Sequence, residues 1–264
     1  MLQQKLEVQE IKRIGIIGSG NVATNLAFKF ANTGIEFAQI FTRNQKSLNA
    51  AITRCQPNVI KDIALFDRNL HLIIIAAPDD SIEKISKEIP NEIPVVHTSG
   101  SVAIASIANR SNYGSFYPLQ TLTIDNDNKN IPIPILIEAS NTAFESELIK
   151  LAETISSQVS VFSSENRKKL HLAAVVVNNF TNHLYNEAEQ YCIESGISFD
   201  LLKPLLKETA RKVQTQSAGS IQTGPAKRKD MNIIEGHLNM LSENKDLRDL
   251  YQLISAQISK KSIR

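Results

Sequence analysis

The stretch that decides the fold lies near the amino end and reads Ile14-Gly-Ile-Ile-Gly-Ser-Gly-Asn-Val-Ala23. Its apolar start predicts a strand over residues 14–17, and the segment that follows predicts a helix ending near residue 31. Between them stands Gly18-x-Gly20-x-x-Ala23, a pattern typical of a dinucleotide-binding turn. Gly18 permits the tight turn, Gly20 lets the backbone approach a pyrophosphate, and Ala23 lets the helix pack closely on the strand. We therefore predict a Rossmann domain from about residue 13 to residue 140.

The end of the next predicted strand indicates which dinucleotide is bound. An NAD site has an acidic side chain about 20 residues past the turn, where it accepts a hydrogen bond from the ribose 2′-hydroxyl. Here that place is held by Thr42-Arg43-Asn44, and the guanidinium suits a 2′-phosphate. The alternative is an ordinary exposed loop arginine. We predict NADP(H) as the cofactor.

Short apolar runs alternate with amphipathic segments in the first half of the chain, which favours βαβ units and a mostly parallel sheet. From Asn141, a candidate helix cap, the pattern becomes helical and stays so. The predicted fold class is α/β, with an N-terminal Rossmann domain over residues 1–140 and an all-helical domain over residues 141–264. The expected strands cover residues 14–17, 37–42, 58–60, 72–76, 94–97, 115–118 and 133–137, and the expected helices cover residues 143–156, 164–194, 200–217, 233–242 and a last segment from 245.

The composition is that of a globular protein, with 42% hydrophobic and 21% charged residues, and 264 residues suffice for two domains. The first ten residues lack the apolar core of a signal peptide, and no run reaches the roughly 18 apolar residues of a membrane helix. We therefore expect a cytoplasmic protein. Cys55 and Cys192 have no CxxC or Cys/His company, so we expect free thiols and no metal site. Residues 200–264 carry 12 basic against 7 acidic side chains without aromatic interleaving, so no nucleic-acid partner is expected.

Two loops follow strands at the edge of the sheet where ligands of such folds bind. Ala77-Pro78-Asp79-Asp80 follows one predicted strand, and His97-Thr98-Ser99-Gly100 follows the next. Both loops are expected to border the nicotinamide, although a helix-capping role is favoured for Asp79 or Asp80. Ser99 and His97 are candidates for holding a substrate carbonyl or carboxylate, with an ordinary Ser-Gly turn as the alternative.

A polar stripe marks the long helix predicted over residues 164–194. His171, Asn178, Asn182, Tyr185 and Glu189 fall on one face at helical spacing, separate from an apolar arc. A solvent-facing or interhelical hydrogen-bonded stripe would explain Tyr185 and Glu189. For His171 and Asn178 the alternative is a face turned toward the nicotinamide, where imidazole donates a proton and Asn178 orients substrate.

Several motifs together resemble a bacterial family of Rossmann-like proteins with a C-terminal DUF2520 helical domain. The resemblance covers nearly the whole chain and implies an NADP oxidoreductase, sometimes labelled coenzyme F420-dependent, a label that implies a deazaflavin partner. The layout is also similar to pyrroline-5-carboxylate reductase and β-hydroxyacid dehydrogenases, whose helical domains build the dimer and close over the nicotinamide. The motifs are the Gly18 turn, His97-Thr-Ser-Gly100, Phe116-Tyr-Pro-Leu-Gln120, His171 with Asn178-Asn-Phe-Thr-Asn-His-Leu-Tyr185, and Thr223-Gly-Pro-Ala226 with Arg228 and Asp230.

The more distant likeness also bears on the proton donor. β-Hydroxyacid dehydrogenases carry a catalytic Lys, and an Asn one turn later, on the first long helix between the domains. Here Lys168 and Lys169 are followed at that spacing by Leu172 and Ala173 rather than by Asn, a departure that argues against the lysine mechanism of that family. The resemblance implies that His171 replaces the Lys and that Ser99 belongs to the turn that touches substrate.

Two hypotheses follow. The first is an NADP(H)-dependent oxidoreductase that moves hydride to or from a small carbonyl or imine substrate in an interdomain cleft and dimerises through its helical domain. The second is a non-catalytic NADP(H)-binding sensor or scaffold, since a dinucleotide site does not establish catalysis. The predicted catalytic residues are His171, Asn178 and Ser99. The predicted cofactor residues are Gly18, Ser19, Gly20, Asn21, Val22, Thr42, Arg43, Asn44, Ala77 and Pro78.

Overall fold

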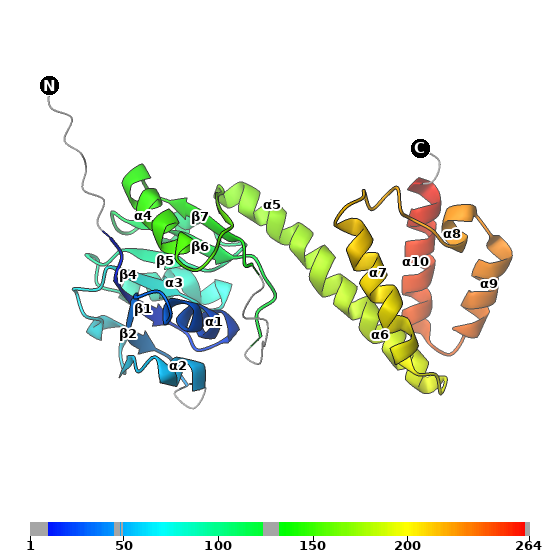
Figure 1. The fold of residues 1–264 in the computed structure, drawn as a ribbon, viewed down its shortest axis with the longest axis horizontal. Coiled ribbons are helices and arrows are strands. Elements are labelled where there is room, and N and C mark those ends of the chain that lie inside the picture. The colour runs from blue at the N-terminus through cyan, green and yellow to red at the C-terminus, as the bar shows by residue number, and fades with distance from the viewer. Residues whose placement is uncertain (1–9, 45–47, 49, 124–131, 262–264) are drawn as a thin grey trace, which may run out of the picture. The chain divides into compact units, whose positions relative to one another are not determined.

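A computed structural model describes residues 10–44, 48, 50–123 and 132–261. The chain divides into two compact units, Met1–Asn179 and Phe180–Arg264. The division falls inside a long helical segment (Figure 1). Each unit is described by itself below.

The first unit is built on an eight-stranded sheet with the order β3-β2-β1-β4-β5-β6-β7-β8. Neighbouring strands are parallel except β6 and β7, which are antiparallel. Parallel pairing from β3 to β6 puts the carboxyl ends of these strands at one edge, where ligands of such sheets bind. The strands are β1 (Arg13–Ile17), β2 (Glu36–Phe41), β3 (Asn58–Ile60), β4 (Leu72–Ile75), β5 (Val95–His97), β6 (Tyr113–Pro118), β7 (Ile135–Ala139) and β8 (Val159–Val161).

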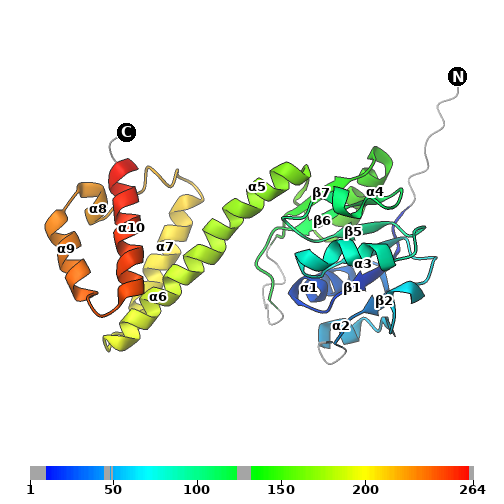
Figure 2. The ribbon, with the colours of Figure 1, turned by 180° about the vertical axis from the view of Figure 1, so that it is seen from behind.

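Helices cover both faces of this sheet, which explains why β4 is buried along its whole length. On one face, α1 (Asn21–Phe30) and α4 (Thr142–Glu153) pack their apolar side chains against strand residues such as Ile16 and Phe116. On the other, α3 (Ile82–Glu88) packs against residues such as Ile73 and Val95. Figure 1 shows α1 in front of the sheet, and Figure 2, from behind, shows α3 in front. Shorter elements of this unit are α2 (Ala50–Arg54), η2 (Ile63–Leu65), η3 (Asp79–Ser81) and η4 (Ile104–Ile107).

All seven predicted strands are present, and the sheet has an eighth strand, β8, where the sequence predicts none. β8 pairs in parallel with β7, so the expectation that only helices follow Asn141 is wrong at residues 159–161. The strand is three residues long and largely exposed at the sheet edge, and so short a run has no periodicity to find. The predicted cap is confirmed, because the Asn141 side chain accepts a hydrogen bond from the backbone N–H of Phe144 at 2.9 Å.

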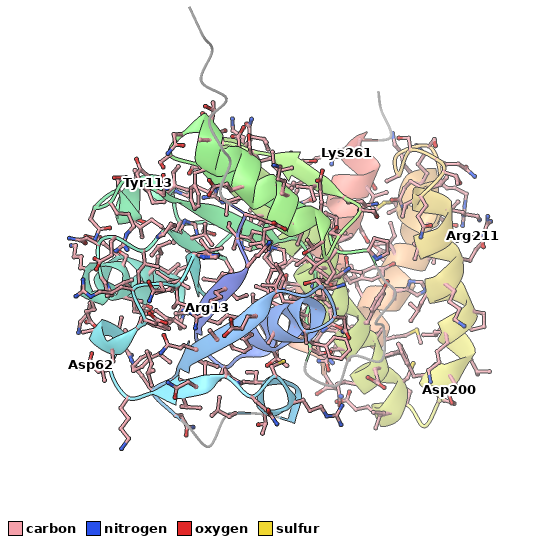
Figure 3. The ribbon with its side chains drawn as sticks, turned by 60° about the vertical axis from the view of Figure 1, so that its left-hand side comes forward. Arg13, Asp62, Tyr113, Asp200, Arg211 and Lys261 are labelled. Carbon is pink, nitrogen blue, oxygen red and sulfur yellow. The ribbon has the colours of Figure 1, made fainter. Side chains whose placement is uncertain are left out.

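The long helical segment begins with α5 (Ser164–Ala174), continues as a π-helical turn η5 (Val175–Phe180) and goes on as α6 (Thr181–Glu194). The rest of the second unit is helical as predicted. Figure 3 labels Asp200 in η6 and Arg211 in α7, which lie toward opposite ends of the stretch formed by these two elements. The described helices contain no stretch long and apolar enough to cross a membrane. The remaining elements are η6 (Phe199–Leu202), α7 (Lys203–Val213), α8 (Pro225–Arg228), α9 (Met231–Met240) and α10 (Lys245–Lys261).

Candidate active site

Gly18 occupies a position that no other residue fits. Its φ is +114°, in a region that favours glycine, and a Cβ there would lie 2.1 Å from the backbone oxygen of Ala76. Its N–H donates to the carbonyl oxygen of Phe41 at 2.9 Å. The turn after β1 is therefore tied to the ends of β4 and β2, which border it on either side in the sheet.

Gly20 is different, because the protein itself does not require a glycine there. Its φ is −78°, and a Cβ would meet nothing within 4 Å. Gly20 is the N-cap of α1, and no side chain caps the helix. The first turn of α1 therefore begins beside open space, into which a Cβ at position 20 would project. This arrangement fits a pyrophosphate bound closely against the turn.

The end of β2 joins the same turn. The hydroxyls of Ser19 and Thr42 lie 2.9 Å apart, and Thr42 Oγ1 also accepts a hydrogen bond from the backbone N–H of Asn44. Arg43 lies exposed between them, and in the described part of the chain no ion pair engages its guanidinium. These contacts bring Ser19, Thr42 and Asn44 together and leave Arg43 exposed beside the turn.

The loop after β4 carries Ala77 and Pro78 at the same edge of the sheet. Pro78 precedes the short η3, and its carbonyl oxygen accepts hydrogen bonds from the backbone N–H and hydroxyl of Ser81. The favoured capping role for Asp79 or Asp80 is wrong, because neither η3 nor α3 has a side-chain cap. Both carboxylates are exposed, in the first turn of η3.

Ser99 lies buried in the loop after β5, where its hydroxyl oxygen accepts hydrogen bonds from the backbone N–H groups of Ser101 and Val102, both at 3.0 Å. Its own N–H donates to Nδ1 of the fully buried His97 at 3.2 Å. Burial, with a smaller contribution from the charge of Arg167, lowers the pKa of His97 to about 3. His97 is therefore a neutral acceptor that holds the loop, and Ser99 keeps one hydroxyl proton to donate.

His171, on α5, lies directly over this loop. Its Nδ1 is 2.8 Å from the hydroxyl of Tyr117, and the two rings meet edge to face with centroids 5.8 Å apart. Gly100 makes the approach possible, since a Cβ there would lie 2.5 Å from Nδ1. Burial raises the pKa of Tyr117, the Arg167 charge lowers it and the Asp79 charge raises it. Tyr117 thus stays protonated at neutral pH and can donate to His171.

Asn178 lies further along the same segment, in η5, where its Nδ2 donates to Thr121 Oγ1 at 2.9 Å. The end of β6 and the chain after it therefore run beside the helical segment, with one hydrogen bond at Tyr117 and another at Thr121. The π-turn from Val175 to Phe180 interrupts the α-helical spacing on which the predicted polar stripe depends.

Comparison with known proteins identifies the family of this chain. The family described as "NADP oxidoreductase coenzyme F420-dependent" matches residues 13–101, and DUF2520 matches residues 133–258. A Bacteroides fragilis protein named "putative NADP oxidoreductase" is 35% identical, with 96% of this chain and 100% of that chain covered and a TM-score of 0.87. The chain belongs to the DUF2520-containing NADP oxidoreductases. The resemblance, the fold class and NADP(H) as cofactor, all predicted from the sequence, are thereby confirmed.

More distant structures share the fold of this oxidoreductase. A reductive aminase from Aspergillus terreus, solved in complex with NADPH4, cyclohexanone and allyl amine, has a TM-score of 0.67 at 15% identity over 95% of each chain. Pyrroline carboxylate reductase from Plasmodium falciparum, solved with NADP, has a TM-score of 0.59 at 14% identity over 96% of this chain and 98% of that one. No curated protein matches the sequence.

Sequence reasoning did not single out Tyr117 for the site of this oxidoreductase. Its motif, Phe116-Tyr-Pro-Leu-Gln120, was visible, and its place near the end of β6 puts it beside the β5 loop. The contact with His171 depends on where α5 crosses the sheet, which no local pattern encodes. Among the described residues, no group of three His, Cys, Asp or Glu side chains could hold a metal ion. Neither Cys55 nor Cys192 forms a disulfide.

Proposed function

We propose that this NADP oxidoreductase transfers hydride to or from a small carbonyl or imine substrate, with His171 as the proton donor. The observation that carries the proposal is the hydrogen bond of 2.8 Å between Tyr117 and His171 Nδ1, directly over Gly100. A proton-transfer pair beside the loop after β5, at the cofactor edge of the sheet, is what carbonyl or imine reduction requires. The ketone and amine held by the structurally similar reductive aminase support this substrate class.

Tyr117 fixes which nitrogen of His171 carries the proton. With the phenol donating to Nδ1, the neutral imidazole holds its proton on Nε2. His171 gives this proton to the carbonyl oxygen or imine nitrogen as the neighbouring carbon becomes tetrahedral, while its Nδ1 takes the phenol proton of Tyr117, so that the ring stays neutral. Tyr117, which is partly exposed, then regains a proton from solvent. NADPH, when bound, supplies the hydride.

We assign two further side chains to the substrate. The remaining hydroxyl proton of Ser99 can donate to a substrate oxygen, while its oxygen keeps the loop in shape by accepting two backbone N–H groups. Asn178, held at Thr121, has a carboxamide oxygen that can accept from a substrate hydroxyl or amine. Both roles are positioning, which sets the reacting atoms in line.

The cofactor residues divide by the part of NADP(H) they serve. The backbone N–H groups at the start of α1 bind the pyrophosphate, because the turn leaves that space open. Arg43 pairs with the 2′-phosphate. The loop after β4, which carries Ala77 and Pro78, lies along the nicotinamide half of the cofactor. The full set is Gly18, Ser19, Gly20, Asn21, Val22, Thr42, Arg43, Asn44, Ala77 and Pro78.

We further propose that the helical unit forms a homodimer. Between residues 180 and 264 few described apolar side chains are buried, whereas many large ones are exposed, among them Leu201 at 74% and Met240 at 67%. A surface so rich in large apolar side chains is typical of an interaction site. A second copy would bury it. The exposed set in this unit is Phe180, Leu184, Ile193, Ile197, Leu201, Leu205, Val213, Met231, Ile233, Met240 and Leu253.

The test is a turnover screen of the purified protein. NADPH oxidation is followed with ketones, ketone–amine mixtures, preformed imines and oxidised deazaflavin, and NADP⁺ reduction with hydroxy acids. We expect turnover with one carbonyl or imine class, and a loss of roughly 10²–10⁴-fold in kcat for His171→Ala with little change in NADPH affinity. His183→Ala, an exposed histidine in the second unit, is the matched control and should keep full activity. Tight NADPH binding without turnover of any substrate would instead support a sensor or scaffold.

A further inference from the structure

A row of polar side chains crosses one face of the sheet, and its member on β6, Ser115, lies on the same strand as Tyr117. Ile75, His97, Ser115 and Glu138 are successive register partners on β4, β5, β6 and β7. The row is apolar on β4 and polar on the next three strands. His97 and Ser115 are fully buried, with relative exposures of 0%. Such a polar layer is unusual inside an α/β sheet, whose buried strands are normally apolar on both faces.

Arg167 of α5 contacts the last member of this row, Glu138. It is the largest fully buried side chain of the protein's described part, with 1% exposure. One guanidinium nitrogen forms an ion pair with Glu138, and another donates to the carbonyl oxygen of Val102. Glu138 also accepts a hydrogen bond from the hydroxyl of Ser164 at 2.6 Å. A single side chain thus joins α5, the sheet and the loop after β5.

Stability does not account for this arrangement. A buried ion pair costs the desolvation of two charges and is often no more stable than apolar residues of similar size. The layer also leaves three buried polar atoms without a hydrogen-bond partner among the described residues: His97 Nε2, Ser115 Oγ and Arg167 Nε. Buried polar atoms without partners reduce stability, so a role beyond stability explains the layer better.

The contacts of Arg167 lead directly to the proposed proton donor. His171 follows Arg167 by one helical turn, so the two side chains leave α5 on the same side. Val102, whose carbonyl oxygen Arg167 holds, donates its N–H to Ser99 Oγ at 3.0 Å. Gly100, between them, lies against the imidazole of His171. The loop beneath His171 and the helix that carries His171 are therefore held by the same guanidinium.

We propose that Arg167, paired with Glu138, is a positioning residue that sets the His171 ring over Gly100 and against the Tyr117 hydroxyl. The inference rests on the proposed function for its effect on turnover, but not for its effect on geometry. A shift of about 1 Å in a catalytic group is enough to cost roughly 10²-fold in rate. Loss of the clamp should therefore lower kcat and leave the binding of NADPH unchanged.

The experiment removes both charges together. Arg167→Met alone leaves Glu138 buried and unpaired and is expected to destabilise the protein, so it cannot separate folding from positioning. The double variant Arg167→Met/Glu138→Met replaces the pair with apolar side chains and should melt within a few degrees of the wild type. Its matched control is Lys169→Met/Glu165→Met, which removes the exposed ion pair on the same helix.

Three readouts decide the proposal. The double variant should have a kcat lower by roughly 10²-fold with an unchanged Kd for NADPH, whereas the control keeps wild-type values. In a His171→Ala background the double substitution should have no further effect, because both changes act through one ring. Arg167→Lys, which keeps the charge but not the planar fork, should have a kcat between that of the double variant and that of the wild type.

A readout independent of turnover separates this proposal from the proposed function. The wild type should show nuclear Overhauser contacts between the Tyr117 and His171 rings, and the folded double variant should lose them. Retained contacts, a wild-type kcat, or rate effects of the double variant and His171→Ala that simply multiply would each overturn the positioning role. If no substrate is turned over, the proposed function fails while the ring contacts still decide the role of Arg167.

Discussion

The Tyr117 hydroxyl lies 2.8 Å from Nδ1 of His171, and the two rings meet edge to face. Tyr117 belongs to a strand of the sheet and His171 to the helix that follows the sheet, 54 residues later. Their contact therefore exists only once α5 is seated on the first unit. Folding of the first unit alone therefore brings the proposed proton donor His171 against Tyr117.

Removing the Tyr117 hydroxyl should lower the rate without disturbing the cofactor. In Tyr117→Phe, His171 loses the donor that fixes its tautomer, so we expect kcat to fall at least about tenfold, with an unchanged Kd for NADPH. Steady-state kinetics and fluorescence titration measure the two quantities. Tyr113→Phe, on the same strand and with no hydroxyl hydrogen bond among the described contacts, is the control. An equal loss in both variants would speak against a special role for Tyr117.

How much the sequence predicts depends on how local each feature is. The Gly18 turn is predictable because its residues are contiguous, and the structure shows the need for glycine at 18 through the contact with Ala76. The strands of the sheet are predictable from apolar runs bounded by polar loops. β8 is not, because three exposed residues at a sheet edge carry no pattern.

The site is less predictable than the fold. His171 was found from helical spacing and resemblance, but its partner Tyr117 was not, because that contact joins residues distant in sequence. Arg167 was missed for a related reason. A sequence offers no sign that this arginine is buried, since most arginines on helices face solvent. Burial of Arg167 follows from the polar row on three strands, and that row exists only in the register of the sheet.

The two glycines of the turn should respond differently to alanine. In Gly20→Ala the Cβ enters open space at a φ that any residue adopts, so the protein should melt at the wild-type temperature or slightly above it. NADPH affinity should nevertheless fall by about tenfold or more, because the methyl group occupies the pyrophosphate position. Thermal unfolding and calorimetric titration check both results. Gly18→Ala should be strongly destabilised. Unchanged NADPH affinity in Gly20→Ala would contradict the assigned pyrophosphate position.

The Arg43 guanidinium should select NADPH over NADH. We expect Arg43→Ala to raise the Kd for NADPH about tenfold to a hundredfold and to leave the Kd for NADH nearly unchanged, since NADH lacks the 2′-phosphate. Arg68→Ala, an exposed arginine before the amino end of β4, should leave both affinities unchanged. Equal losses for the two cofactors in Arg43→Ala would rule out the 2′-phosphate contact.

Burial of His97 should make the protein sensitive to acid. Its pKa is lowered to about 3 in the folded state, whereas an unfolded histidine titrates near pH 6.5. The unfolded chain therefore binds a proton first as the pH falls, and His97 removes stability between these two values, by up to about 1.4 kcal/mol per pH unit. His97→Asn keeps an acceptor for the Ser99 N–H without a titrating group. Its free energy of unfolding should fall less than that of the wild type between pH 6.5 and 4.5. Parallel pH profiles for the two proteins would refute a neutral buried His97.

Transfer of deuterium from NADPH that carries the label at C4 of the nicotinamide tests the central claim most directly. With the active substrate found in the screen, mass spectrometry of the product should show one deuterium on the reduced carbon, from one of the two stereospecifically labelled cofactors. The Tyr117→Phe and His171→Ala variants should form the same labelled product more slowly. Unlabelled product from both labelled cofactors would contradict direct hydride transfer at this site.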